Sequence, residues 1–157
     1  GTALNDFLYS AVRNLDSRQG RPVVILLSDG VDTLSFLRME EVIWKLRRSD
    51  AVIYRVQVQE SAARGLGYAT VWRSMKQQKR EVEGLDRAVS ESGGRVRILQ
   101  SIDELPAALD EILLELRQQY VLGYYSTVAH EQDRFRPVSV RVDRPDADVR
   151  TRSGHVN

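Results

Sequence analysis

The sequence predicts an α/β protein with a doubly wound, mostly parallel sheet, flanking helices and a C-terminal antiparallel hairpin. Two observations lead to this prediction. Short apolar runs alternate with amphipathic segments along most of the 157 residues, the order that layers helices on both faces of a sheet. The run at 23–27 also consists of five apolar residues without alternation, which is typical of a strand covered on both faces.

The first expected element is an amphipathic helix near the N-terminus. Its apolar residues recur at three- and four-residue intervals, which places them on one face. Thr2 is the expected N-cap, because its hydroxyl can accept a hydrogen bond from a free amide of the first turn. The apolar residues of this helix are Leu4, Phe7, Leu8, Ala11, Val12 and Leu15.

Strands and helices then alternate up to residue 99. Glycine-containing turns mark the end of the first strand and the end of the third helix. The elements expected in this part are a strand at 23–27, a helix around Met39–Leu46 capped by Ser35, a strand at 51–58, a helix that ends at Gly93 and a strand at 95–99.

The C-terminal third has a different pattern. Ser101 and Glu104 have the spacing of a capping box, which predicts a fourth helix behind them. The strand-like runs 120–126 and 137–142 flank a polar loop, which predicts an antiparallel hairpin, and the charged stretch from Arg144 onward is expected to be a loose tail. We therefore assign 1–126 to the α/β core, and 127–157 to the last hairpin strand and tail of the same domain.

Composition argues against several classes of partner and chemistry. With 23 Lys and Arg against 22 Asp and Glu, the net charge of +1 gives no sign of a nucleic-acid-binding face. The lack of cysteine excludes disulfides and thiolate metal sites. No apolar run approaches the ~20 residues of a membrane span, so membrane insertion is not expected. Phosphate-binding glycine loops and the G-x-S-x-G motif are also absent, so we do not expect an enzyme.

A basic segment at 60–83 separates the second strand from the third helix. Between residues 61 and 80 it contains basic side chains and no acidic one. It is either a surface insertion with a solvated basic side or a binding surface for an acidic partner, since insertions often carry function. The candidate contacts for such a partner are Arg73, Lys76 and Lys79.

Thr2 and Asp29 are expected at the same edge of the sheet. Open parallel sheets bind ligands beyond the carboxyl ends of their strands, and Asp29 follows the first strand directly. The helix that begins near Thr2 runs antiparallel to this strand, so its start lies at that edge. Hydroxyl and carboxylate oxygens are hard donors that suit Mg²⁺, Mn²⁺ or Ca²⁺. We take Thr2 and Asp29 as candidate metal ligands, and Ser28 and Asp32 as groups that could orient them.

These residues resemble the von Willebrand factor type A domain, in particular the bacterial von Willebrand type A-related group. The resemblance implies a Rossmann-like fold and a metal-ion-dependent adhesion site, in which a cation on Thr2 and Asp29 engages an acidic group of a partner protein. It also implies a secreted, periplasmic or cell-surface protein. The matching segments are Gly1–Leu4, Val24–Gly30, Asp32, Ser35, Ser92–Arg95, Gln119–Tyr124, Phe135–Arg136 and Val149–Gly154.

The chain departs from that family in one respect. The family's Asp-x-Ser-x-Ser segment is absent, and the resemblance places it, with the family's first strand, upstream of Gly1. The chain then corresponds to the C-terminal part of a larger domain, and we expect weak or no cation binding. The apolar strand 23–27 would lack a neighbour on one edge, which favours pairing with another chain. We therefore expect a homodimer, or a strand supplied in trans.

The residues leave three functions open. The first is a non-catalytic adhesion module that binds an acidic partner group through a divalent cation. The second is a metal-free interaction or scaffold domain that uses the hairpin and the basic segment as contact surfaces. The third, a nucleotide-binding enzyme, has the least support because the phosphate-binding motifs are missing.

Overall fold

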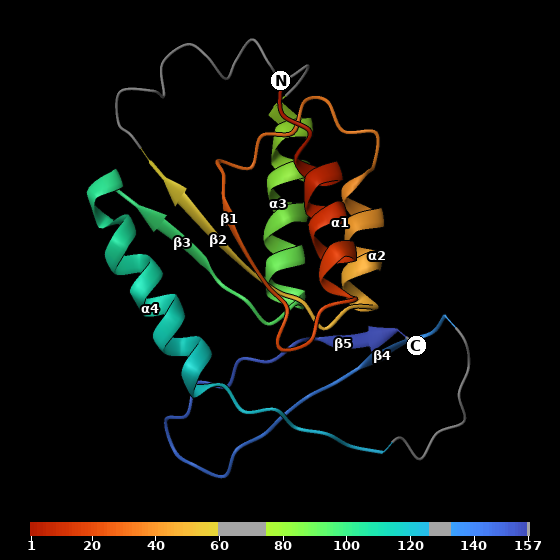
Figure 1. The fold of residues 1–157 in the computed structure, drawn as a ribbon, viewed down its shortest axis with the longest axis vertical. Coiled ribbons are helices and arrows are strands. Elements are labelled where there is room, and N and C mark those ends of the chain that lie inside the picture. The colour runs from red at the N-terminus through yellow and green to blue at the C-terminus, as the bar shows by residue number, and fades with distance from the viewer. Residues whose placement is uncertain (60–74, 126–132, 157) are drawn as a thin grey trace.

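The chain forms an α/β structure whose first elements follow the predicted order (Figure 1). The computed structural model describes residues 1–59, 75–125 and 133–156, with only the backbone of residues 75–78. Its elements are α1 (Leu4–Leu15), β1 (Val23–Leu27), α2 (Met39–Arg47), β2 (Val52–Val58), α3 (Met75–Glu91), β3 (Val96–Leu99), the 3-10 turn η1 (Ile102–Glu104), α4 (Leu105–Gln118), β4 (Phe135–Pro137) and β5 (Gly154–Val156).

Three strands form one parallel sheet in the order β1-β2-β3. In the central strand, β2, Val52 lies opposite Val23 of β1 and Arg55 lies opposite Val96 of β3. Within the described residues, β1 pairs only with β2, so one of its edges carries no strand. The predicted parallel core is confirmed, and the strand bounds agree with the prediction to within one residue.

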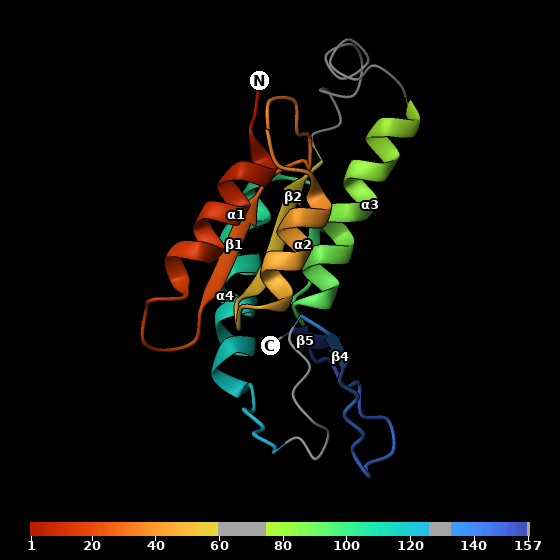
Figure 2. The ribbon, with the colours of Figure 1, turned by 90° about the vertical axis from the view of Figure 1, so that its right-hand side faces the viewer.

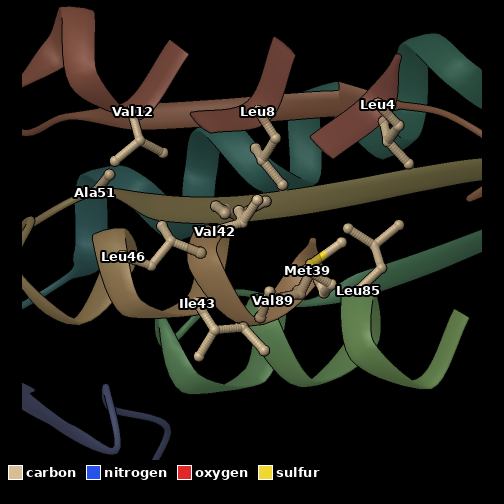
Figure 3. Packing of buried hydrophobic residues seen from close by; sticks show 12 residues of the cluster. Leu4, Leu8, Val12, Met39, Val42, Ile43, Leu46, Ala51, Leu85 and Val89 are labelled. Atoms are coloured by element: carbon tan, nitrogen blue, oxygen red, sulfur yellow. The ribbon is translucent and has the colours of Figure 1, made fainter. Parts of the chain in front are cut away.

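Helices cover both faces of this sheet (Figures 1 and 2). Successive residues of β2 point to opposite faces: Ile53 packs with α1, α2 and α3, whereas Tyr54 and Val56 pack against α4. Figure 3 shows the first layer, one cluster to which α1 contributes Leu8, α2 contributes Val42 and α3 contributes Leu85. Burial of each such side chain contributes about 1.5–3 kcal/mol. This layer fixes the start of α1 against the end of the sheet.

The C-terminal antiparallel pair exists, but the predicted hairpin is wrong in its strands. The two paired segments are β4 and β5, with Phe135 opposite Val156 and Pro137 opposite Gly154. The run 120–125 is not a strand and is largely exposed, and Val142 lies outside the pair. Both runs have a strand-like composition, but a strand needs a ladder partner, and composition does not report which segments pair.

The expected loose tail is wrong for residues 150–156, which pack against the helical layer, whereas residues 144–149 are exposed and form no helix or strand. The Ser153 N–H donates to the Glu91 carbonyl, and Arg150 donates to the Gly93 carbonyl. Arg152 donates to two carbonyls at the end of α2. The two arginines satisfy free carbonyls at helix ends, so their charge serves attachment of the segment and not solvation alone. No helix among the described residues is long and apolar enough to cross a membrane.

A candidate binding site at the carboxyl edge of the sheet

The start of α1 lies against the loop that follows β1. The Thr2 carbonyl accepts hydrogen bonds from the N–H groups of Thr33 (2.9 Å) and Leu34 (3.1 Å). The Thr2 N–H donates to the Thr33 hydroxyl at 2.9 Å. Thr2 is thus tied to the loop 28–38 that carries Asp29, at the edge where the parallel strands end (Figure 1).

The same loop caps α1, which corrects the predicted caps. The Asn5 N–H donates to Asp32 at 2.8 Å, and the Asp6 N–H donates to Ser35 at 3.2 Å. Ala3 is the N-cap residue and makes no side-chain cap, so Thr2 is not the cap, and Ser35 caps α1 instead of α2. First-turn amides need acceptors but do not require them from the preceding residue. Here a loop about 30 residues away supplies them.

The bonding between α1 and this loop is reciprocal. The Asp6 carboxylate accepts the N–H groups of Phe36 (3.1 Å) and Leu37 (2.9 Å). Each segment therefore satisfies backbone amides of the other, and two acidic side chains lie beside the positive end of the helix, where the macrodipole favours them. The loop 28–38 and the first turn of α1 therefore form one hydrogen-bonded unit.

Asp29 and Ser28 shape the turn at the end of β1. One oxygen of the Asp29 carboxylate accepts the Val31 N–H at 3.0 Å, and the Ser28 hydroxyl oxygen accepts the Gly30 N–H at 3.1 Å. Gly30 has a φ of +87°, a conformation that a residue with a side chain adopts only with strain. Thr2 and Asp29 are both exposed. The structure thus places both candidate ligands on the surface of one bonded unit.

The donors present fit a cation only in part. Thr2 and Asp29 offer hard oxygens, as a Mg²⁺ ion requires. The Asp32 carboxylate is already used, since it accepts from the Asn5 and Ser35 N–H groups and from the Ser35 hydroxyl. Across the described ranges, no group of three or more acidic or histidine side chains is placed to hold a metal. Water or a partner would have to complete the shell, and the shared ion stays a prediction.

Glu81 of α3 is a member of this region that the sequence reasoning missed. Burial raises the pKa of Glu81, and the negative charge of Asp32 raises it further, while a hydrogen bond with Asn5 opposes both effects. Asn5 itself is buried and donates to the Leu37 carbonyl. The only signal in the sequence was the helical position of Glu81, which does not reveal a neighbour about 50 residues away.

Large apolar side chains are exposed beside these polar groups. Leu34 and Phe36 of the loop are 61% and 96% exposed. Phe7, which helical spacing predicted to be buried, is 72% exposed and follows Asp6, whose carboxylate holds the Phe36 backbone. Exposed apolar groups that gather in one region are typical of interaction sites.

Arg55 is the second residue that the sequence reasoning missed. It lies in the middle of β2 and is 1% exposed. Its guanidinium donates to the carbonyls of Ser28 and Asp29, directly beneath the candidate site. A charged residue in the middle of a covered strand is rare without a partner, so the position of Arg55 within the run 51–58 was a signal in the sequence, although its partners appear only in the fold.

The predicted basic contact surface lies mostly outside the described residues. Arg73 falls in the part of the chain that the structure does not describe, and for Lys76 only the backbone, within α3, is described. Lys79 is exposed and lies 3.7 Å from Glu83 on the next turn of α3. The role of this surface stays a prediction.

Comparison with known proteins found no match to a protein-family model, to a curated protein or to a solved structure.

Proposed function

We propose that the chain is a non-catalytic protein-binding module that contacts its partner with the carboxyl edge of its parallel sheet. The observation that carries this proposal is the reciprocal bonding of α1 with the loop 28–38, which holds Thr2 and Asp29 on one surface. A surface that is ordered before binding loses less conformational entropy when a partner arrives. Leu34 and Phe36 would provide apolar contact area beside the polar groups.

A divalent cation is the proposed polar link to the partner. Mg²⁺, or Mn²⁺ or Ca²⁺, would bind the Thr2 hydroxyl and the Asp29 carboxylate, and an acidic side chain of the partner would fill an open position. Ser28 would orient Asp29 through the turn, and Asp32 would hold the start of α1 in place. The hardness of the donors and the resemblance to the von Willebrand factor type A domain support this mode.

A metal-free interaction domain is the second candidate. It is favoured by the engagement of Asp32 in capping, which leaves fewer carboxylate oxygens for an ion. In this mode Phe36, Leu34 and Phe7 would supply most of the contact area, and Asp29 would serve the turn alone.

Manganese-induced broadening of amide signals tests the cation mode. In a ¹⁵N-labelled chain, Mn²⁺ should broaden the amides of Thr2 and of residues 29–33 first, because paramagnetic relaxation falls steeply with distance. Asp29→Asn should abolish this pattern. Asp143→Asn, at an exposed carboxylate in the C-terminal segment, is the matched control and should leave it unchanged. Broadening that ignores Asp29→Asn would exclude the proposed ligand pair.

Binding to defined peptides separates the two modes. Arrayed 12-residue peptides that contain Asp or Glu would be compared with copies that carry Asn or Gln at the same places, in Mg²⁺ and in EDTA. The cation mode predicts that acidic peptides are retained in Mg²⁺ only, and that Asp29→Asn abolishes their retention. The metal-free mode predicts retention in EDTA that is lost in Phe36→Ser. If neither condition retains any peptide above the level of Phe36→Ser, this edge is not a peptide-binding surface.

The open edge of β1 provides a second proposed contact. The strand is apolar throughout and, among the described residues, pairs on one side only, so its other edge is open to a strand from another chain. We expect a concentration-dependent dimer in sedimentation-velocity experiments, and Leu27→Lys, at an exposed position of the strand, should shift the distribution toward monomer, because a charge on this edge opposes pairing. A monomer at all concentrations, for wild type as well, would contradict self-association through this edge.

A further inference from the structure

Arg55 is a buried cation in the centre of the sheet. It is 1% exposed and lies in β2 between Leu26 of β1 and Val96 of β3, which are apolar. Removing a guanidinium from water is unfavourable unless its donors are paired. Packing alone therefore does not explain an arginine that is buried at this position of β2.

The acceptors of the Arg55 guanidinium lie in three parts of the chain: the turn after β1, β2 itself and α3. Its guanidinium donates to the carbonyls of Ser28 (3.4 Å) and Asp29 (2.8 Å), to the side chain of Gln57 (2.8 Å) and to the Asp86 carboxylate of α3 (2.6 Å). Two of these acceptors are backbone groups of the turn that presents Asp29. Arg55 thus connects this turn to α3.

The fit around Arg55 extends to Gly30. A Cβ built on Gly30 would lie 2.7 Å from a terminal nitrogen of the guanidinium, and Gly30 also has a positive φ. The guanidinium and the turn therefore pack so closely that a side chain at residue 30 would not fit between them. A lysine could not reproduce this contact, because it offers one compact ammonium in place of a planar group with several fixed donors.

We propose that Arg55 is the positioning residue of the candidate site, and that Asp86 holds Arg55 in place for this role. Arg55 fixes the carbonyls of Ser28 and Asp29, and thereby the direction in which the Asp29 side chain leaves the turn. The proposal rests on the proposed function, in which Asp29 binds a cation. Residues that orient a metal ligand typically alter affinity by roughly 10–100-fold when they are changed.

The test compares Arg55→Lys, Arg55→Met and Asp86→Asn with the control Arg47→Met. Arg47 also forms an ion pair on this helical layer, with Glu91, but that pair does not contact the turn 28–30. Two readouts are needed: the ¹H–¹⁵N positions of residues 29–31 without metal, and the Mn²⁺ affinity from the broadening of the same amides. Circular dichroism reports whether each variant is folded.

Arg55→Lys should fold, shift the amides of residues 29–31 and weaken Mn²⁺ binding roughly tenfold or more. Asp86→Asn should shift the same amides by a smaller amount, and Arg47→Met should leave them in place. A folded Arg55→Lys with unchanged amides 29–31 would overturn the proposal. So would the failure of all three variants to fold while Arg47→Met folds, since Arg55 would then be a determinant of folding.

The amide positions measured without metal test the role of Arg55 independently of whether the chain binds a cation. If the wild-type chain shows no broadening at residues 29–31, the cation mode fails, whereas the amide shifts of Arg55→Lys still decide whether Arg55 holds the turn. If Mn²⁺ binds at Asp29 with the same affinity in wild type and Arg55→Lys, the cation mode stands and the positioning role is wrong.

Discussion

The two ends of the helical layer α1–α3 are held by opposite kinds of side chain. At the carboxyl edge of the sheet, the first amides of α1 donate to Asp32 and Ser35. At the other end, carbonyls that close α2 and α3 accept from Arg152 and Arg150 of the C-terminal segment. Helix starts present free N–H groups and helix ends present free carbonyls, so acceptors gather at one end and cationic donors at the other.

The two ends of the helical layer also differ in how far the described chain covers them. At the carboxyl edge, short side chains bond to backbone and leave Thr2, Asp29 and Phe36 exposed. At the opposite end, β4 and β5 lie across the helix ends (Figure 1), where Arg47 stacks on the Phe135 ring at 4.4 Å. The closed end is therefore held by attachment of the C-terminal segment, whereas among the described residues the other, open end keeps exposed side chains, and it is the end that we propose contacts a partner.

Arg152→Met should have the largest effect on stability, because it breaks the closed end. The variant loses the bonds from the guanidinium to the carbonyls of Leu46 and Ser49 and the contact with Asp50. Hydrogen bonds from a charged donor are individually worth roughly 1.5–3 kcal/mol, so we expect a loss of about 2 kcal/mol in the free energy of unfolding, measured by urea denaturation. Arg144→Met, at an exposed arginine of the same segment, is the control and should change it by less than about 0.5 kcal/mol.

Asp32→Ala should have a smaller effect and act at the open end. It removes the acceptor for the Asn5 N–H and for two donors of Ser35, and loss of an N-terminal cap costs about 0.5–2 kcal/mol. Amide exchange at Asn5 should become faster, while exchange at Ser153 should not change. Asp143→Ala tests for a general charge effect, and equal destabilisation by both variants would contradict the capping role.

The parallel core could be predicted from sequence because its signals are local. The apolar spacing of residues 4–15 and the continuous run at 23–27 define their own elements, and the structure confirms both. The capping box of Ser101 and Glu104 is also local, and the structure shows it. In each case the information lies within a few residues.

What could not be predicted depends on partners far apart in the chain. Thr2 has the composition of a cap, but the amides near it are taken by Asp32 and Ser35. The run 120–126 has strand composition, yet β5 pairs with β4 instead. Arg55 and Glu81 were overlooked for the same reason, since their roles depend on neighbours that only the folded chain supplies.

Substitution of two glutamates of α3 should have the smallest effect on stability. Because the pKa values of these glutamates are shifted in opposite directions, the same substitution should act oppositely at the two ends of the helical layer. At the closed end, burial raises the pKa of Glu91, but hydrogen bonds from Arg47 and Arg87 outweigh it, so the net pKa is lowered. Its contribution to stability is present above the pKa of the unfolded chain and is lost as the pH falls through the folded pKa. Glu91→Gln should therefore destabilise at pH 7, and less so at pH 3.

Glu81 at the open end should behave in the opposite way. Its pKa is raised, so its protonated form contributes stability at low pH, and this contribution is lost as the pH rises through the folded pKa. Glu81→Gln should raise the melting temperature at pH 7 relative to wild type, with a gain that shrinks below pH 4, and Glu83→Gln on the exposed side of α3 should show neither change. If Glu81→Gln and Glu91→Gln shift the melting temperature in the same direction at pH 7, the two ends do not differ electrostatically in the way that their contacts imply.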